Sequence, residues 1–328
     1  MKHKRVRLAG ELLILALLAV SVAGASGAFS LDEYETYQIR LALQVVNDGG
    51  PATEVAIRIP LFMTENLPPY QTLRTFDVSS AQGLRLKSTE TGQAAEINLP
   101  SLPKGGRFQA ELTFSFYNAA IEYNLERSSG WDRGELRYLR PEPGIESEAP
   151  AIRALAERLA RDGGDPVAKA KNIFAYVNTN FKYERLDQSS AYSALRTLQA
   201  GRGVCTDLSV LYAALCRAAG IPARIVSGYR FDPKEIGARE TDLNRFAHAW
   251  TEVYLSGLGW VPADPTSFTY QNGALVTSFT HFGRIAGNDR HLFAHYGIEE
   301  KLYESTHKYN PGKPARIKIT VQKLIKKI

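Results

Sequence analysis

Several residue types that mark specialised proteins are scarce in this chain. It has 328 residues but only 2 cysteines and 6 histidines. Two cysteines are too few for a disulfide-held scaffold, and they do not form the close pairs that bind zinc. The sequence also lacks a glycine-rich phosphate loop and an acidic calcium-binding loop. These absences argue against disulfide-rich, zinc-ribbon, P-loop and EF-hand proteins, and we expect no cofactor and no metal site.

An apolar run long enough to span a membrane comfortably is also lacking, since Leu12–Ala23 falls short of the ~20 residues needed. Basic residues precede this run and small residues follow it, in the order of a secretory signal with an A-x-A-like cleavage site. We therefore expect residues 1–28 to be a signal peptide, or else an uncleaved N-terminal anchor. Both interpretations predict a secreted or extracytoplasmic protein.

A broad basic surface for nucleic acid is not indicated, although the formal net charge is +6. The positive excess lies in residues 1–28 and 313–328, and the chain between them is mildly acidic. We therefore expect no nucleic-acid partner. The alternation in Ala315–Val321 predicts a solvated edge strand protected by lysines. A competing hypothesis is that the basic tail or the N-terminal segment contacts the cell wall or a membrane.

A long β region comes first in the body of the chain, at residues 29–140. Alternating apolar runs separated by turn residues predict an all-β domain, an Ig-like sandwich. The expected strands are Tyr34–Val46, Glu54–Leu61, Thr75–Val78, Leu84–Glu90, Ala94–Leu99 and Arg107–Tyr117. No combination of acid, base and nucleophile stands out in this region.

Helices are predicted after the linker Pro141–Gly144. Ala151–Ala160 has apolar residues at helical spacing, and Asp165 followed by proline is a helix-start signal. A helical half followed by a β-rich half is typical of an α+β domain. We place this domain at residues 145–300 and treat 301–328 as a basic C-terminal strand or tail.

The most informative segment is Gly-Val-Cys-Thr-Asp-Leu-Ser at 203–209. Its glycine allows a sharp turn into a helix from Cys205 to Ala219. The expected buried stripe is Leu208, Leu211, Leu215 and Ala218. A thiol at a helix N-terminus is favoured as the thiolate by unpaired N–H groups and the helix dipole. Cys216 lies about 16 Å further along this helix, beyond the ~7 Å of a disulfide, so we expect it in the core.

A histidine and an aspartate follow in two predicted strands. Ala247–Leu255 alternates with the period of a β-strand and carries His248 on one face. The partner strand Trp260–Asp264 contains Pro262, which predicts an edge position or an early end. Pairing of the two strands brings Asp264 alongside His248. A thiolate, an imidazole and an orienting carboxylate are the three roles that thiol acyl transfer requires.

Together these motifs resemble the bacterial branch of the transglutaminase-like superfamily. The resemblance covers roughly residues 150–270 and rests on Gly-Val-Cys-Thr-Asp at 203–207, the run Arg217–Arg224, His-Ala-Trp-Thr-Glu-Val-Tyr at 248–254 and Trp-Val-Pro-Ala-Asp-Pro-Thr at 260–266. It implies a papain-like α+β core. It further implies Cys205 as the nucleophile, His248 as the general base and acid, and Asp264 as the orienting carboxylate.

The resemblance implies chemistry on amide bonds through an acyl-enzyme. We expect a secreted or envelope-anchored cysteine peptidase or amidase acting on a protein or peptide, with cell-wall peptides among the candidates. Two alternatives stay open: a protein-glutamine γ-glutamyltransferase (transglutaminase), and a catalytically silent envelope scaffold. The polar loop Tyr229–Asn244 is either a substrate-selecting loop or a solvated connection. His291 and His295 would share one face of a helix, but no third metal ligand accompanies them.

Overall fold

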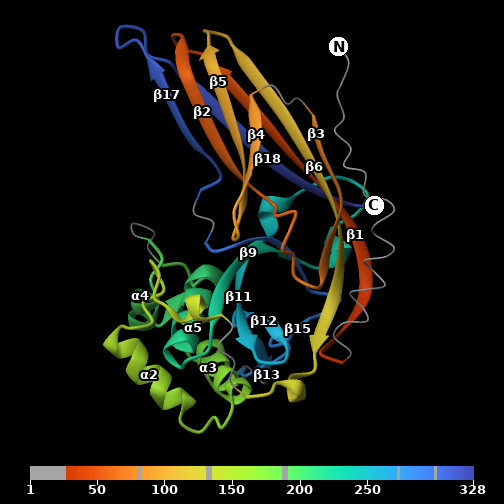
Figure 1. The fold of residues 1–328 in the computed structure, drawn as a ribbon, viewed down its shortest axis with the longest axis vertical. Helices are drawn as coiled ribbons and strands as arrows, with labels where there is room; N and C mark the ends of the chain where they lie inside the picture. The colour runs from red at the N-terminus through yellow and green to blue at the C-terminus, as the bar shows by residue number, and fades with distance from the viewer. Residues whose placement is uncertain (1–26, 80–82, 131–134, 187–190, 272–273, 299–300) are drawn as a thin grey trace.

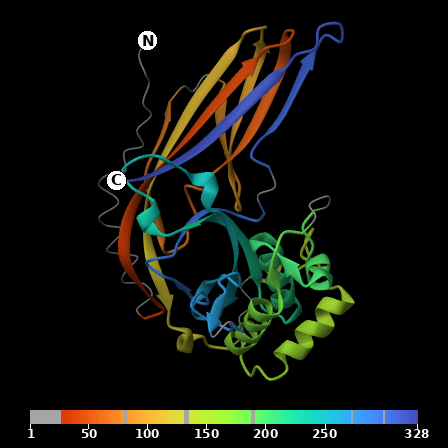
Figure 2. The same ribbon diagram turned by 180° about the vertical axis from the view of Figure 1, so that it is seen from behind.

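The computed structural model describes residues 27–79, 83–130, 135–186, 191–271, 274–298 and 301–328. The segment expected to be a signal peptide or anchor lies almost entirely outside these ranges. Within them, no helix combines the length and the apolar character needed to cross a membrane. Figures 1 and 2 show long strands at one end of the molecule and helices packed on a smaller sheet at the other.

Two sheets build the N-terminal β region. One has the order β10-β18-β1-β6-β15, with β3 also paired to β6, and the other has the order β17-β2-β5-β4. Their strands are β1 Phe29–Asn47, β2 Ala52–Leu61, β3 Gln71–Ser79, β4 Leu84–Ser88, β5 Gln93–Leu102, β6 Arg107–Tyr123, β10 Thr241–Asp242, β15 Arg284–Ile285, β17 Glu304–Tyr309 and β18 Ile317–Lys327. All six strands expected from the sequence in this region are confirmed.

Strand β1 shows how the alternating sequence builds this region. Ile39, Leu41, Leu43 and Val45 are buried, and the residues between them are more exposed. These side chains pack with apolar residues of β2, β5 and β6 into one core. The region is therefore a two-sheet β structure, and its Ig-like character stays a prediction.

The C-terminal strands complete these sheets and do not form a separate tail. β17 pairs with β2, and β18 pairs with β1 along its whole length. On its other side β18 meets only the two-residue β10, so it lies near the edge of the sheet, close to what the sequence predicted. Lys323 follows the segment Ala315–Val321 and is buried, with 5% of it exposed. Lys323 shares the buried face of the strand with Val321 and Ile325.

In the part of the chain that the structure describes, four helices make the other half together with a smaller sheet. They are α2 Pro150–Ala160, α3 Pro166–Asn180, α4 Ala194–Ala200 and α5 Cys205–Ala218. Asp165 caps α3 as predicted, because its side chain accepts from the backbone N–H of Ala168. The single buried stripe expected for α5 is wrong, since every residue from Asp207 to Arg217 is buried. Helix α5 contacts α2, α3 and α4 as well as β9 and β11, so no face is left to solvent over that length.

The smaller sheet has the order β12-β11-β9-β16. Its strands are β9 Ala223–Phe231, β11 Ala247–Leu255, β12 Gly259–Ala263 and β16 Arg290–Tyr296. The β11–β12 hairpin and the edge position of β12 agree with the sequence. The remaining short elements are β7 Lys182–Tyr183, β8 Arg202–Gly203, β13 Thr269–Gln271, β14 Ala274–Val276, η1 Leu125–Arg127, η2 Leu136–Leu139, η3 Pro233–Glu235 and η4 Leu243–Phe246.

Strand β9 joins the two halves. The ring of Tyr229 stacks on Phe62 with centroids 5.6 Å apart, and Phe231 meets Tyr37 edge-on at 5.2 Å. Both β9 residues belong to the apolar core of the β region. The β region is therefore packed directly against the sheet that carries His248.

Candidate active site

The turn that precedes α5 positions Cys205, the candidate nucleophile. Gly201 ends α4 in the left-handed conformation, with φ 64°. At Gly203 a Cβ atom would lie 2.6 Å from the side chain of Asp207, so only glycine fits there. The Asp207 carboxylate in turn accepts from the Val204 N–H at 3.0 Å. Cys205 is the first residue of α5, as the sequence predicted.

The helix is fastened to the strand that carries the histidine. Ser209 Oγ donates to the carbonyl of Ala249 at 3.1 Å, and Thr251 Oγ1 donates to the carbonyl of Ser209 at 3.1 Å. These two buried hydrogen bonds join α5 to β11 one turn beyond Cys205. They fix the distance between the thiol and the neighbouring residue of the strand, His248.

Asp264 follows the last residue of β12 and is 2% exposed. Its Oδ2 accepts from His248 Nε2 at 2.8 Å. Its Oδ1 accepts from the backbone N–H and the hydroxyl of Thr266 at 3.0 and 2.5 Å. A carboxylate held by several donors cannot rotate freely, so it fixes the orientation of the imidazole ring.

The thiol and the imidazole perturb each other's pKa. Burial opposes the Cys205 thiolate, but the hydrogen bond and the charge of His248 outweigh it and lower the pKa of the thiol to about 7. Burial likewise opposes the imidazolium, but the charge of Asp264 raises the pKa of His248 to about 9. The arrangement therefore favours a thiolate–imidazolium pair between these two values.

Two further side chains contact Asp264, and their part in the site was not predicted from the sequence. Arg230 donates to Asp264 Oδ2 at 3.0 Å and forms a two-point ion pair with Asp289. His291 Nε2 lies 3.2 Å from the same oxygen. Burial lowers the pKa of His291 despite Asp264, so His291 stays neutral and donates a hydrogen bond. No local pattern in the sequence pointed to these contacts, since Arg230 lies in β9 and His291 in β16, far from Asp264 in the sequence.

The helix-face arrangement expected for His291 and His295 is wrong, because both lie on strand β16. Another group could hold a cation by geometry: ligand atoms of His248, Asp264 and His291 lie within 4.8 Å of one another. In that group Asp264 Oδ2 already accepts from both histidines and from Arg230. A guanidinium at this oxygen opposes a second positive charge, so the hydrogen-bond network accounts for the cluster.

Tyr183 is a functional candidate that the structure adds. Strand β7 pairs with β8 so that Tyr183 lies opposite Gly203, two residues before Cys205. The Tyr183 hydroxyl hydrogen-bonds the thiol and contributes to its lowered pKa. Tyr183 is 52% exposed, but partial desolvation of its hydroxyl and the neighbouring Cys205 raise the pKa of Tyr183, so the phenol keeps its proton and remains a donor. A donor at this place can support the thiolate or an oxyanion formed beside it.

Cavities open on two sides of His248. One, of about 350 Å³, is lined by Cys205, His248 and Tyr229 together with residues of β18 and of the loops around it. The other, of about 400 Å³, is lined by His248, Tyr183 and Arg230. The loop that was expected either to select substrates or to be a solvated connection contributes to both sides. A substrate chain lying across the site would pass Cys205 with room on both sides of the thiol.

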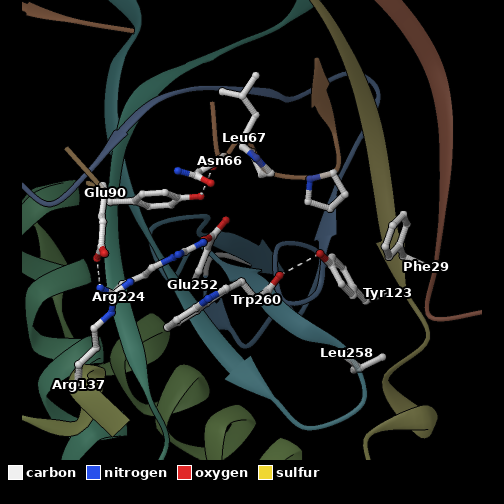
Figure 3. Close-up of a pocket in the computed structure, with 13 residues that line it drawn as sticks. Phe29, Asn66, Leu67, Glu90, Tyr123, Arg137, Arg224, Glu252, Leu258 and Trp260 are labelled. Carbon is white, nitrogen blue, oxygen red and sulfur yellow. Dashed lines mark hydrogen bonds and ion pairs between the residues drawn. The ribbon is translucent and has the colours of Figure 1, made fainter. Parts of the chain in front are cut away.

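A third cavity, of about 490 Å³, lies between the β region and the smaller sheet and is lined by other residues (Figure 3). There Arg224 lies between the rings of Trp260 and Tyr296, 4.0 and 3.7 Å from their centroids. It also pairs with buried Glu252 at 2.7 Å. The pairing neutralises the guanidinium, so this cluster has an evident structural role at the junction.

Cys205, His248 and Asp264 are thus brought together as the sequence predicted, and their catalytic roles stay predictions. Cys216 is fully buried, which confirms its expected place in the core. Burial raises the pKa of its thiol to about 12. Both cysteines are free.

Comparisons with known proteins find similarity over the helical half of the chain. A family model for the transglutaminase-like superfamily matches residues 153–265. An uncharacterized protein of Bacillus subtilis, YebA, is 33% identical over 138 residues, which cover 39% of this chain and 19% of YebA. A protein-glutamine gamma-glutamyltransferase of Pseudomonas aeruginosa is 30% identical over 121 residues, covering 36% of this chain and 18% of that protein. The chain therefore spans less than a fifth of the length of either relative.

Among solved structures, one from Cytophaga hutchinsonii described as a "putative cysteine protease" superposes over 92% of this chain and 100% of its own, with a TM-score of 0.57. At 16% identity this similarity shows the fold alone. It extends over the β region as well as the helical half. The stretch that contains Cys205, His248 and Asp264 lies within the residues that match the transglutaminase-like superfamily model.

Proposed function

We propose that the protein is a thiol enzyme acting on amide bonds, most simply a cysteine peptidase or amidase. The observation that carries this proposal is the chain of contacts from the Cys205 thiol through His248 to Asp264. The thiol lies at a helix N-terminus, and the pKa of His248 is raised to about 9 by the buried carboxylate. A scaffold without turnover has no need for this arrangement.

The contacts of Cys205 and His248 support the following acylation step. The Cys205 thiolate attacks the carbonyl carbon of the amide, a C–S bond forms, and the carbonyl oxygen becomes an oxyanion. The Tyr183 hydroxyl, which hydrogen-bonds the thiol, can donate to that oxyanion. The His248 imidazolium then gives its proton to the amide nitrogen as the C–N bond breaks. The amine leaves, and a thioester with neutral His248 remains.

Deacylation decides the reaction class. If His248 takes a proton from water, the hydroxide attacks the thioester, the C–S bond breaks, and a carboxylic acid is released. If a primary amine enters instead, the same steps give a new amide, which is transglutamination. The similarity to the Pseudomonas gamma-glutamyltransferase favours keeping this second candidate. Both reactions regenerate the Cys205–His248 pair.

The test offers both acceptors to the purified chain. Incubation with casein, in the presence of the fluorescent amine monodansylcadaverine, is followed by mass spectrometry of peptide ends and of glutamine side chains. New peptide ends support a peptidase, and labelled glutamines support a transglutaminase. Either product must vanish in Cys205→Ala. A wild-type protein that yields neither product, with a thiol of ordinary reactivity, would favour the binding or scaffold alternative.

The basic and apolar start of the chain supports a further proposal, that the enzyme works outside the cytoplasm on envelope or secreted peptides. Fusion of residues 1–28 to a reporter enzyme that is active only after export tests this. An inactive fusion with normal expression would contradict it.

A further inference from the structure

One arginine links two carboxylates at the site. Arg230 lies on β9, between β11 and β16, directly opposite His291 in the pairing with β16. Its Nη1 donates to Asp264 Oδ2 at 3.0 Å, and its Nε and Nη2 donate to the two carboxylate oxygens of Asp289 at 2.7 and 2.5 Å. The rigid fork of a guanidinium suits such a two-point pair. Asp289 therefore anchors Arg230, and Arg230 in turn contacts the carboxylate that orients His248.

Arg230 shares one oxygen atom with the imidazole. Asp264 Oδ2 accepts from His248 Nε2 at 2.8 Å as well as from Arg230. The side chain of Asp264 is 3% exposed, so little water screens these contacts. A guanidinium keeps its proton at any pH that the fold withstands, whereas an imidazole loses and regains one. Arg230 is therefore a fixed positive charge at the oxygen on which the charge of His248 depends.

The other groups around Asp264 and His248 come from several elements. His291 Nε2 lies 3.2 Å from Asp264 Oδ2, and His281 Nε2 lies 3.2 Å from Asp289 Oδ2. Burial lowers the pKa of both histidines, that of His281 to about 4, so both are neutral at pH 7. Further neighbours are Cys205 of α5, Tyr183 of β7 and Thr266 after β12. Among these described neighbours, Arg230 brings the positive charge that stays fixed while His248 titrates.

A fixed cation at this oxygen matters when His248 gives up its proton. During acylation the proton on the ring nitrogen that faces the thiol passes to the amide nitrogen as the C–N bond breaks, and the Nε2 proton stays in the hydrogen bond to Asp264. Asp264 is then a buried carboxylate without its imidazolium, which is costly unless another cation remains. Burial opposes the ionised carboxyl, but His248, His291 and Arg230 outweigh it and hold the pKa of Asp264 well below its usual range. Arg230 is the partner among them that stays positive after this step.

We propose that Arg230 is a positioning residue: anchored by Asp289, it holds Asp264 towards His248 and takes up part of the carboxylate charge, so that the imidazolium releases its proton to the leaving amine. This inference rests on the proposed thiol enzyme. Arg230 acts through Asp264 and not on the reacting atoms. Without Arg230, the whole charge of the carboxylate would attract the imidazolium, and His248 would be a weaker acid.

The test measures the pKa of His248 directly. The full chain is labelled with carbon-13 histidine, and the ring signals are followed by NMR from pH 5 to 11 in a Cys205→Ala background, which removes the coupled thiol. The signal of His248 is identified by its loss in His248→Gln. Arg230→Met is expected to raise the pKa of His248 by about one to two units, the effect of removing one charge at contact distance. Arg230→Lys keeps the cation and should restore most of the wild-type value.

Arg245→Met is the matched control, because it removes an exposed arginine that lines the same cavity as Arg230. Water and salt screen that charge, so the pKa of His248 should change much less. Thermal melting shows which variants are folded. A pKa that is unchanged or lowered in folded Arg230→Met, or raised equally in Arg245→Met, would overturn the proposal.

A second variant and the wild type keep the test decisive. If Arg230→Met does not fold, Arg230→Gln takes its place with the same expected direction. If neither folds, the wild-type chain decides, because Arg230 and His248 share an oxygen atom. The carbon-13 signal of the Arg230 guanidinium must then change with the midpoint of the His248 titration, and a signal that stays constant would argue against the proposal.

None of these measurements needs turnover, so failure of the proposed enzyme is seen separately, in the iodoacetamide rate of Cys205. With a substrate in hand, the alkaline limit of kcat/KM should move up in Arg230→Met by the shift that NMR measures. A lower rate with an unmoved limit would indicate a merely structural role for Arg230 and would contradict the proposal.

Discussion

Replacement of Asp264 by asparagine tests the electrostatic reasoning at its centre. The side chain keeps its size and its place but loses the negative charge that raises the pKa of His248 to about 9. The ordinary value for histidine is about 6.5, so the Asp264 charge, together with the neighbouring Cys205, outweighs burial and favours the imidazolium. Without the imidazolium, the pKa of Cys205 should return from about 7 towards its reference value of 9.0.

The magnitude at pH 7 follows from two opposing effects. A rise in the thiol pKa from about 7 to 9 lowers the thiolate fraction from about one half to about one hundredth, roughly fiftyfold. A thiolate of higher pKa is intrinsically more reactive, by about eightfold for two units. The net expectation is that alkylation of Asp264→Asn slows about sixfold at pH 7, and that the midpoint of its pH profile moves up by about two units.

The assay is the rate of iodoacetamide labelling of Cys205 from pH 5 to 10, followed by intact mass. Asp289→Asn is the matched control, since Asp289 pairs with Arg230 but makes no hydrogen bond to His248. Its midpoint should move much less. A midpoint that stays near 7 in folded Asp264→Asn would show that the carboxylate does not sustain the ion pair.

Three further predictions concern other parts of the site and the fold. The dependence of kcat/KM on pH should be bell-shaped for any amide substrate. It should rise as Cys205 ionises near pH 7 and fall as His248 loses its proton near pH 9. A value of kcat/KM that rises steadily to pH 10 would contradict this prediction. Tyr183→Phe should raise the pH midpoint of Cys205 labelling by less than Asp264→Asn does, because the phenol lowers the pKa of Cys205 less than His248 does. An unchanged midpoint would show that the hydroxyl does not contact the thiol. Gly228→Ala should lower the free energy of unfolding, measured in urea, by about 2–4 kcal/mol, because the added Cβ would overlap the Leu292 carbonyl and meet Trp250. A Cβ at Gly237 has open space, so the control Gly237→Ala should lower the free energy of unfolding by less than about 1 kcal/mol.

Several local features were predictable because short-range chemistry encodes them. The turn before Cys205 needs small residues, and the Asp165–Pro166 pair predicts the start of α3. The alternation of Ala247–Leu255 and the proline in the next strand fixed the β11–β12 hairpin and its edge. Hairpin pairing then brought Asp264 next to His248, since neighbouring strands place their ends together.

Other features could not be predicted from local pattern. The single apolar stripe expected for α5 was wrong because burial of a helix depends on how many neighbours surround it, and those neighbours come from both sides in the fold. The burial of Lys323 was not predicted, for a similar reason. The alternation of apolar residues in β18 predicted that one face of the strand would be buried. It did not predict that this face would border the cleft.

The sequence by itself determined the three residues of the candidate triad, the helix and the strands that present them, and the class of chemistry they suit. Only the tertiary structure decided that Arg230 and His291 hold the carboxylate, that Tyr183 contacts the thiol, and that a lysine of the last strand reaches the same cleft. The physical reason is that the spacing of apolar residues and the capping of helices depend on residues within one helical turn or one hairpin. Contacts between distant strands follow from how whole sheets pack, and no short segment of the chain carries that information.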